Sequence, residues 1–579
     1  MPENAICYRN IFVVSDLFLT FARKMERINM KRREGVRRGG VSRLVLTAVL
    51  ALFAFSASAQ FRINTGGDSP LRKLQYAELA VTNLYVDSVD EQKLVEDAIK
   101  GMLDKLDPHS SYATPKEVKE LNEPLNGNFE GIGVQFNMMD DTLVVIQPVT
   151  NGPSEKVGII AGDRIVSVND TAIAGVKMSK EEIMRRLRGP KGSKVKVGIK
   201  RRGISGLAYF TITRDKIPLN TVDASYMIRP GIGYIRLSSF GITTHSEMME
   251  CFAKLRKQGM KDLILDLQDN GGGFLQAAAD VLNEFLENGD LIVYTEGRAV
   301  PRQEFRAMGN GTFQKGKVIV LVNEYSASAA EIVSGAIQDQ DRGLVIGRRT
   351  YGKGLVQRPV DLPDGSMIRL TVAHYYTPSG RCIQKPYVKG DIEGYYRDME
   401  KRYKHGEFTN ADSIHFADSL KYETLKQHRT VYGGGGIMPD YFVPLDTTRY
   451  TKFHRELSAK SIVINANLRY AEKNRKALLK LYGKEADPVN SSGIPVEGKG
   501  FKAFNENYQV PQSLLDDIYA EGKKQGVEPK DDDELQQTNK YLSMQLKALI
   551  ARDLWSMSEY FRVVNEDADA IKCALDKLR

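Results

Sequence analysis

Two short segments of the chain carry residue types that could perform acyl transfer. The first is Ser-Ala-Ser-Ala-Ala-Glu at 326–331, which follows the apolar run 318–322 and opens a helix-compatible stretch. A serine hydroxyl needs a nearby base to become a nucleophile, and the first N–H groups of a helix can stabilise an oxyanion. Ser326 and Ser328 are both candidate nucleophiles. A serine that merely caps the helix is the alternative, and spacing alone leaves it open.

The second segment supplies a candidate base, Lys353, between Gly352 and Gly354. A lysine acts as a general base only when burial lowers its pKa enough to leave the amine neutral. Gln357 lies four residues further on, which predicts that it shares a face with Lys353 in a helix or a strand and could orient the amine. A phosphate-binding lysine is the rival interpretation, but the glycine-rich phosphate-loop pattern is absent.

A third segment could present a backbone donor to the serine turn. The strand-like run around Leu265 ends in three consecutive glycines, Gly271 to Gly273. An ordinary turn is the alternative for such a run. His374, near the end of another predicted strand, is the other candidate base, and the intact glycine-flanked lysine favours Lys353.

Charge and composition exclude several classes of function. The formal charge is +9, but residues 1–59 contain ten Lys/Arg and four Asp/Glu, so only +3 belongs to the remainder. That distribution argues against nucleic-acid binding. The four cysteines and seven histidines show no metal-ligand spacing. We therefore predict no metal, no disulfide framework and no cofactor.

The amino-terminal region, residues 1–59, has the pattern of an export signal. A basic stretch begins at Lys31, an apolar run covers 44–55, and Ala57 and Ala59 fit a signal-peptidase site. Twelve apolar residues are short for a membrane span. We predict a cleaved signal peptide at 30–59 and export to a bacterial periplasm, where the protein is soluble or peripherally associated with the envelope.

The mature chain divides by its periodicity into four regions. Residues 60–122 predict a helical segment, with two helices within 70–106. Residues 123–216 predict short strands separated by glycines. Residues 217–445 alternate strands and helices, the rhythm of an α/β fold, with a charged insertion at 385–432. Residues 446–579 predict a helical region whose role, as a substrate gate, a dimer surface or a cover, stays open.

Several motifs resemble those of known families. Gly131 to Phe136, together with Ala-Gly-Asp-x-Ile-x-x-Val-Asn at 161–169, resembles a PDZ domain of the bacterial protease type. Residues 70–445 resemble the carboxyl-terminal processing peptidases, or tail-specific proteases. The motifs that carry this likeness are Leu-Asp-Pro-His-Ser-Ser-Tyr at 106–112, Asp-Leu-x-x-Asn-x-Gly-Gly at 266–273, the serine and lysine segments, and Tyr-Thr-Pro-Ser-Gly-Arg-Cys-Ile-Gln at 376–384.

The resemblance implies a fold and a set of catalytic roles. The fold is an α/β multidomain arrangement, with a core similar to the crotonase-like fold, an inserted PDZ domain and helical terminal regions. The implied nucleophile is Ser328, the base is Lys353, and Gln357 supports the base. Backbone N–H groups of Ala329 and Gly272 would form the oxyanion hole. The chain departs from the family pattern at Gln268, Ala330 and Gly271, where the family carries arginine, serine and proline.

The PDZ resemblance implies how substrate would be recognised. Gly131, Ile132 and Gly133 are the candidates that bind a terminal carboxylate, while the peptide adds as a strand to a sheet edge. A small β-domain without a ligand is the alternative. The implied partners are polypeptides with apolar carboxyl-terminal tails, and an adaptor or a second copy could bind through 446–579. The expected function is a serine endopeptidase, general or dedicated to one precursor. The alternative is a non-catalytic PDZ scaffold that holds envelope proteins by their tails.

Overall fold

The computed structural model describes residues 69–149, 151–483 and 499–579. The predicted signal peptide and most of the predicted linker at 484–500 lie outside these residues. The chain forms two compact units, residues 1–95 and 96–579. Two helices, α3 (Pro70–Leu84) and α4 (Glu91–Leu103), confirm the helical prediction for 70–106. Within the described residues, no helix has both the length and the apolar character that a membrane crossing requires.

A mainly antiparallel sheet occupies the glycine-punctuated region after residue 123. Its strand order is β3-β4-β5-β7-β8, with β6 paired to β5, so β3 lies at an edge. The entry strand β2 (Asn128–Gly131) pairs with the exit strand β9 (Asp215–Pro218). The remaining elements are β3 (Val134–Met139), β4 (Thr142–Pro148), α6 (Pro153–Lys156), β5 (Arg164–Val168), β6 (Thr171–Ala172), α7 (Lys180–Leu187), β7 (Lys194–Lys200) and β8 (Ala208–Thr213).

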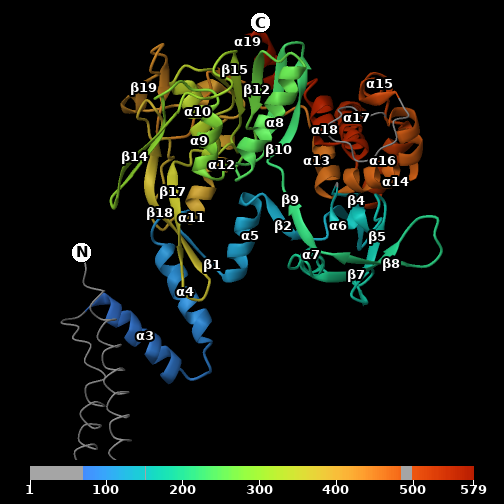
Figure 1. Cartoon of the computed structure of the whole chain (residues 1–579), viewed down its shortest axis with the longest axis horizontal. Coiled ribbons are helices and arrows are strands. Elements are labelled where there is room, and N and C mark those ends of the chain that lie inside the picture. Colours follow the sequence, from blue (N-terminus) through green and yellow to red (C-terminus); the bar gives the residue numbers. More distant parts are fainter. Residues whose placement is uncertain (1–68, 150, 484–498) are drawn as a thin grey trace, which may run out of the picture. The chain divides into compact units, whose positions relative to one another are not determined.

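The α/β region is built on a six-stranded sheet of order β10-β11-β12-β15-β16-β21, of which β10, β12 and β15 are labelled in Figure 1. The β10–β11 pair is antiparallel and the other pairs are parallel. The strands are β10 (Val222–Arg229), β11 (Ile232–Leu237), β12 (Asp262–Asp266), β15 (Val318–Val322), β16 (Leu344–Gly347) and β21 (Tyr441–Phe442). Every residue of β15 is buried. A continuous apolar strand is expected where both faces of a parallel sheet are covered.

Different helices cover the two faces of this sheet. Val318, Val320 and Val322 pack with α8 (Thr244–Lys257), α9 (Leu275–Asn283) and α10 (Ala329–Asp339). The intervening Ile319 and Leu321 pack with α19 (Asp569–Leu578) on the other face. The last helix therefore joins the core sheet, although the predicted boundary at 445 assigned it to a separate helical region.

A second, five-stranded sheet carries the residues that follow Lys353. Strand β18 (Met367–Tyr376) pairs with β1 (Ser111–Ala113), β13 (Leu291–Gly297) and β17 (Leu355–Asp361), and β14 (Val300–Arg306) pairs with β13. The β1 pairing brings the Asp-Pro-His-Ser-Ser segment against β18. The insertion then forms α11 (Ile392–Tyr396), α12 (Asp398–Lys404), two short 3₁₀ turns, and the β19–β20 hairpin (Lys421–Glu423 and Thr430–Tyr432).

The carboxyl-terminal region is helical, as predicted, and has a hydrophobic core of its own. Phe504, Leu546 and Trp555 are among the buried side chains that form it. The helices that precede α19 are α13 (Lys452–Ala459), α14 (Ile462–Tyr482), α15 (Gly500–Asn507), α16 (Gln512–Lys524), α17 (Asp532–Leu554) and α18 (Met557–Val564).

Candidate active site

Ser328 lies at the sharp turn between β15 and α10, where it is the residue that immediately precedes the helix. Its backbone angles, φ 56° and ψ −114°, belong to a region that glycine favours. Holding a serine there costs on the order of 1–3 kcal/mol, and such strain is concentrated at functional sites. Ser328 is also partly exposed. A strained, accessible serine at the start of a helix is suited to present a nucleophilic hydroxyl.

Ser326, the other candidate serine, has a structural role. It is fully buried, and its Oγ donates to the Leu267 carbonyl (2.7 Å) while it accepts from the Asn323 N–H (2.9 Å). These bonds join the ends of β12 and β15. Because this hydroxyl is committed to two backbone partners, the geometry favours Ser328 as the reactive residue.

Glu331 ties the serine turn to the lysine loop. Its Oε2 accepts from the backbone N–H groups of Ser328 and Lys353, each at 2.8 Å, so these two nitrogens are at most twice that distance apart. Its Oε1 accepts from Gly352 N–H (2.7 Å) and Thr350 Oγ1 (2.5 Å). Burial raises the pKa of this carboxyl, and the four donors oppose that change. Sequence reasoning assigned Glu331 no role, although Ser-x-x-Glu before an apolar run is a known capping pattern.

Tyr375 of β18 makes the complementary bridge between carbonyl groups. Its buried hydroxyl donates to the Lys353 carbonyl and lies 3.1 Å from the Ser328 carbonyl oxygen. Side chains alternate along a strand, so His374 is directed to the opposite face of β18 from Tyr375. The His374 ring lies 6.5 Å from the Tyr376 ring, centre to centre, and is tilted by 56° to it. This placement argues against the Ser–His alternative.

Lys353 lies in the loop before β17, and its environment makes the amine easier to deprotonate than a free lysine. Burial lowers the pKa of Lys353 to about 8, helped by the charge of Arg369 and opposed by Glu331 and Asp107. The flanking glycines are required by close packing. A Cβ on Gly354 would lie 2.8 Å from the Gln384 nitrogen, and one on Gly352, whose φ is +88°, would lie 3.1 Å from the Gly436 nitrogen. Glycines at 352 and 354 thus allow the loop to pack against residues 384–385 and 435–436.

His109 is a neighbour of Lys353 that sequence reasoning did not assign. Burial and the nearby Lys353 charge lower the pKa of His109 to about 4, so the imidazole is neutral. Its backbone N–H donates to Asp107 Oδ1 (2.9 Å), and the same oxygen accepts from Thr371 Oγ1 of β18 (2.8 Å). The Asp-Pro-His segment therefore forms one wall beside the base.

Gln357 lies close to the Lys353 region because β17 pairs with β18, and not because it shares a strand face with Lys353 as predicted. Lys353 precedes β17, and the β17–β18 pairing shifts register between Val356 and Gln357, so no common strand face relates Gln357 to Lys353. Its Nε2 donates to the Leu355 carbonyl (3.1 Å) and to Thr371 Oγ1 (3.4 Å). The spacing argument was wrong, while the supporting role of Gln357 stays a prediction.

The two predicted oxyanion donors lie side by side. A Cβ on Gly272, whose φ is +99°, would lie 2.7 Å from Ser328 Cβ and 2.9 Å from the Ala329 nitrogen. Ala329 is the first residue of α10, where N–H groups have no partner within the helix. The Gly272 N–H, however, donates to Asn270 Oδ1 (2.8 Å). One of the two donors is therefore engaged by a neighbouring side chain in this conformation.

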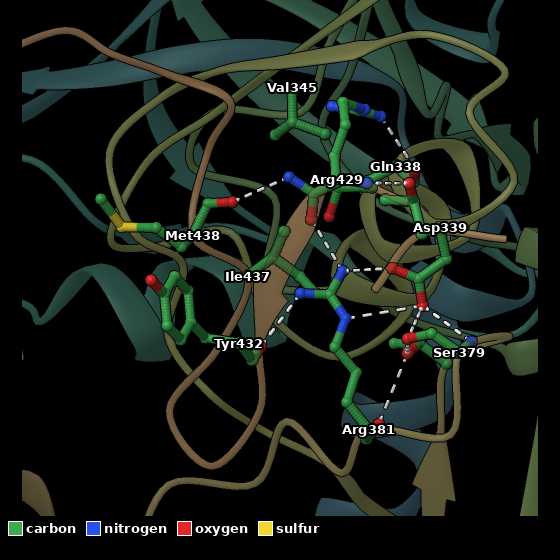
Figure 2. Close-up of polar contacts among 12 residues, drawn as sticks. Gln338, Asp339, Val345, Ser379, Arg381, Arg429, Tyr432, Ile437 and Met438 are labelled. Carbon is green, nitrogen blue, oxygen red and sulfur yellow. Dashed lines mark hydrogen bonds and ion pairs between the residues drawn. The ribbon is translucent and has the colours of Figure 1, made fainter. Parts of the chain in front are cut away.

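The far end of α10 is held by a buried polar cluster (Figure 2). Arg381 and Asp339 form an ion pair at 2.6 Å with both side chains fully buried. Arg381 also donates to Gln338 Oε1 (2.7 Å) and to the Tyr432 carbonyl (3.0 Å). Asp339 in turn accepts from Ser379 Oγ (2.7 Å). The helix that follows Ser328 is thus fixed at its beginning by Glu331 and at its end by this cluster.

The candidate carboxylate loop of the PDZ region has a defined geometry. Gly131 ends β2, and the side chain of Ile132 is buried in the domain core. The Ile132 carbonyl accepts from Ser154 Oγ (2.6 Å), which fixes the turn. Gly133 has φ +71°, and a Cβ there would lie 2.9 Å from Ile217. These residues lead directly into the edge strand β3, so the loop and the edge are arranged as strand addition of a peptide tail requires.

No group of three or more metal-binding side chains was found in the described parts of the chain. The chemistry of the serine–lysine arrangement needs no metal, because the base and the oxyanion donors are supplied by protein groups.

Sequence comparisons define the class of protein. Residues 231–394 match peptidase family S41, residues 131–206 match the PDZ domain, and residues 55–116 match the activating protease CtpB N-terminal domain. Residues 489–556 match a family of unknown function. These matches, with the site described above, define a serine-type peptidase that contains a PDZ domain.

Individual relatives give the family. The chain is 36% identical over 374 residues to the carboxy-terminal processing protease CtpA of Bacillus subtilis, which covers 63% of this chain and 79% of that protein. It is 38% identical over 319 residues to a carboxy-terminal-processing protease of Bartonella bacilliformis, covering 54% and 72%. Among solved structures, the photosystem II D1 C-terminal processing protease is 34% identical, covers 56% of this chain and 86% of that one, and has a TM-score of 0.33. The chain belongs to the carboxy-terminal processing proteases of family S41.

Proposed function

We propose that the protein is an exported endopeptidase that binds substrate tails through its PDZ domain and cleaves peptide bonds with a Ser328–Lys353 dyad. The observation that carries this proposal is the pair of bridges between the two residues: Glu331 binds both backbone N–H groups, and Tyr375 contacts both carbonyl groups. The pattern of residues 30–59 supports export to a periplasm.

The reaction is acyl transfer in two steps. The neutral Lys353 amine takes the proton of Ser328 Oγ as that oxygen attacks the peptide carbonyl carbon, and the resulting ammonium then protonates the leaving amine. The C–N bond breaks and an ester to Ser328 remains. Water, deprotonated by the same lysine, attacks the ester carbon; the ester C–O bond breaks, the lysine ammonium returns the proton to Ser328 Oγ, and the acid is released. Gln357 supports the base indirectly, through Thr371.

The oxyanion of each tetrahedral intermediate requires backbone donors. Ala329 N–H is available at the start of α10, whereas Gly272 N–H first has to leave Asn270 Oδ1. A rotation of the Gly271–Gly272 peptide achieves this, and the glycines on both sides allow it. Binding of substrate beside Ser328 would favour the rotated form, because the oxyanion accepts the hydrogen bond that Asn270 gives up.

Tail recognition is the role we assign to the PDZ domain. The edge strand β3 offers backbone groups to an extended peptide, and the turn at Gly131, Ile132 and Gly133 offers N–H groups to its terminal carboxylate. The tails of preferred substrates end in apolar residues. An adaptor or a second copy bound to the helical region 446–579 stays a prediction.

Labelling with a fluorophosphonate probe tests the catalytic assignment. Wild-type protein should be labelled and should cleave an unfolded protein with an apolar tail, whereas Ser328→Ala and Lys353→Ala should do neither. Ser326→Ala should lose stability but keep the label, since its hydroxyl only joins two strands. Labelling that persists in Ser328→Ala would refute the dyad.

The same experiment separates an enzyme from the scaffold alternative. A scaffold would bind tails equally well in wild type and Ser328→Ala but would show neither cleavage nor labelling. Tail binding by Ser328→Ala together with cleavage by wild type alone is the result that the peptidase proposal expects.

A further inference from the structure

The insertion 385–432 contacts the loop that carries Lys353 through a buried arginine. Arg402 of α12 is 3% exposed. Its Nη1 donates to the Thr350 carbonyl (3.1 Å) and its Nη2 to the Arg349 carbonyl (2.8 Å). The guanidinium presents donors in a fixed fork, which matches two successive carbonyl groups. These carbonyls lie only three and four residues before Lys353.

A carboxylate within the insertion holds this arginine in place. Arg402 Nε donates to Glu407 Oε2 (3.2 Å), and the same oxygen forms an ion pair with Arg349. Arg349 in turn donates to the Gly435 carbonyl (2.8 Å). The insertion and the glycine-rich segment that follows it therefore enclose residues 349–352.

A second contact comes from Tyr395 of α11, which is 3% exposed. Its hydroxyl lies 2.9 Å from His109 Nε2, and the two rings meet edge to face. Lys385 Nζ lies 4.2 Å from the centre of the Tyr395 ring and binds Asp398 at 2.9 Å. Through Tyr395 the insertion supports the His109 wall beside the base.

The titratable groups around Lys353 come from three other elements. Arg369 belongs to β18, Glu331 to α10, and Asp107 and the neutral His109 to the segment before β1. Lys385 of the insertion lies over the Tyr395 ring and pairs with Asp398. Burial is the largest cause of the low pKa of Lys353. Water that entered beside the loop would reverse this effect.

We propose that the insertion maintains Lys353 as a base. Arg402 positions the loop that carries Lys353, and Tyr395 together with His109 shields the Lys353 amine from water. This inference rests on the proposed Ser328–Lys353 chemistry. Arg402 touches neither the substrate nor the reacting atoms, so it is a positioning residue. The prediction is that the insertion controls the chemical step and not substrate capture.

The test is the pH profile of cleavage by the full chain, measured on a fluorogenic peptide from about pH 6 to about pH 10. Arg402→Ala should lower kcat roughly tenfold or more with little change in KM. Its acid limb should move to higher pH by about half a unit or more, since a hydrated lysine is protonated more readily. Arg402→Lys, which places one donor group there, should recover part of both effects.

Arg397→Ala is the matched control, because Arg397 lies on the same insertion with a side chain 62% exposed and pairs with Glu393 in an exposed salt bridge. It should keep the wild-type kcat and acid limb. A folded Arg402→Ala protein with the wild-type profile would overturn the proposal.

If Arg402→Ala fails to fold, Tyr395→Phe carries the test. This substitution removes one hydroxyl and keeps the ring, and it should raise the acid limb and lower kcat. An unchanged profile would overturn the proposal. If the Lys353→Ala variant instead cleaved as fast as the wild type, the proposed dyad itself would be refuted. Failure of the insertion proposal and failure of the dyad are therefore distinguishable.

Discussion

In the proposed dyad, Lys353 has to be neutral to accept a proton and charged to return one, so its pKa would set the pH range of catalysis. Burial holds the pKa of Lys353 near 8, below the ordinary value of 10.5. The adjacent His109 adds no charge at neutral pH because its own pKa is lowered to about 4. Of these two groups, Lys353 is therefore the one expected to titrate in the pH range where the enzyme is active.

The pH dependence of kcat/KM should follow deprotonation of Lys353. Activity should be low at acid pH, rise through about pH 8, and increase about tenfold between pH 7 and pH 9, because the neutral fraction of a base with this pKa grows by that factor. A steady-state profile on a peptide without ionisable groups measures it. A profile that rises instead near pH 6 would point to a histidine base.

Residues within a motif could be predicted from the sequence, whereas their partners could not. Ser328 and Lys353 stand out by composition and spacing, and the resemblance chose between the two serines. Tyr375 and His109 remained hidden because their contacts join segments that lie far apart in the chain. Gln357 shows the reverse error, since a regular period was assumed across a loop and a register shift.

At the scale of elements, α10 is the helix on which the site depends. Its first turn is tied to the lysine loop through Glu331. Its last turn is tied to Arg381 through Asp339, as Figure 2 shows. The helix therefore cannot move without disturbing both sets of contacts. Removing one partner of a buried ion pair leaves an uncompensated charge, which is costlier than the pair was worth.

Asp339→Asn should therefore destabilise the core by about 3–5 kcal/mol, because Arg381 stays buried without its counter-charge. Chemical denaturation followed by circular dichroism measures the change. Asp418→Asn is the control: Asp418 is 90% exposed and pairs with Lys421 on the surface, so its loss should have little effect. Equal effects of the two substitutions would contradict the assigned importance of the buried pair.

Most elements of the core were predictable, because buried parallel strands are continuous apolar runs. The predicted strands at 232–237, 318–322 and 344–347 agree with the structure residue for residue. Strand β17 was not predicted, since Gln357, Arg358 and Pro359 interrupt its apolar pattern and it is defined by pairing with β18. Nor could periodicity show that α19 covers the core sheet. The implied likeness of the core to the crotonase-like fold stays a prediction.

At the scale of the whole molecule, the chain combines a peptidase core with a PDZ domain. Recognition of a free carboxylate would make cleavage depend on a group far from the scissile bond. Substrate-tail chemistry and PDZ-loop geometry should then affect the same kinetic parameter.

Amidation of a substrate's carboxyl terminus should lower kcat/KM roughly tenfold, because a charge-assisted interaction is lost. Gly133→Ala should abolish this discrimination, since its φ is +71° and a Cβ would meet Ile217. Gly203→Ala is matched in φ, +84°, and has open space around it, so discrimination should persist there. Equal cleavage of both substrates by wild type would remove the assigned role of the loop.

The buried cluster at the end of α10 also bears on when the enzyme becomes active during its own synthesis. Gln338 binds Asp440 across 102 residues of sequence, and Arg381 binds the Tyr432 carbonyl across 51. Contacts between such distant segments form late, because the chain loses loop entropy before it gains their stabilisation. The last turn of α10 therefore depends on residues up to Asp440 for two of its contacts. A chain that ended before residue 432 would contain the Ser-Ala-Ser segment but would lack both of these contacts.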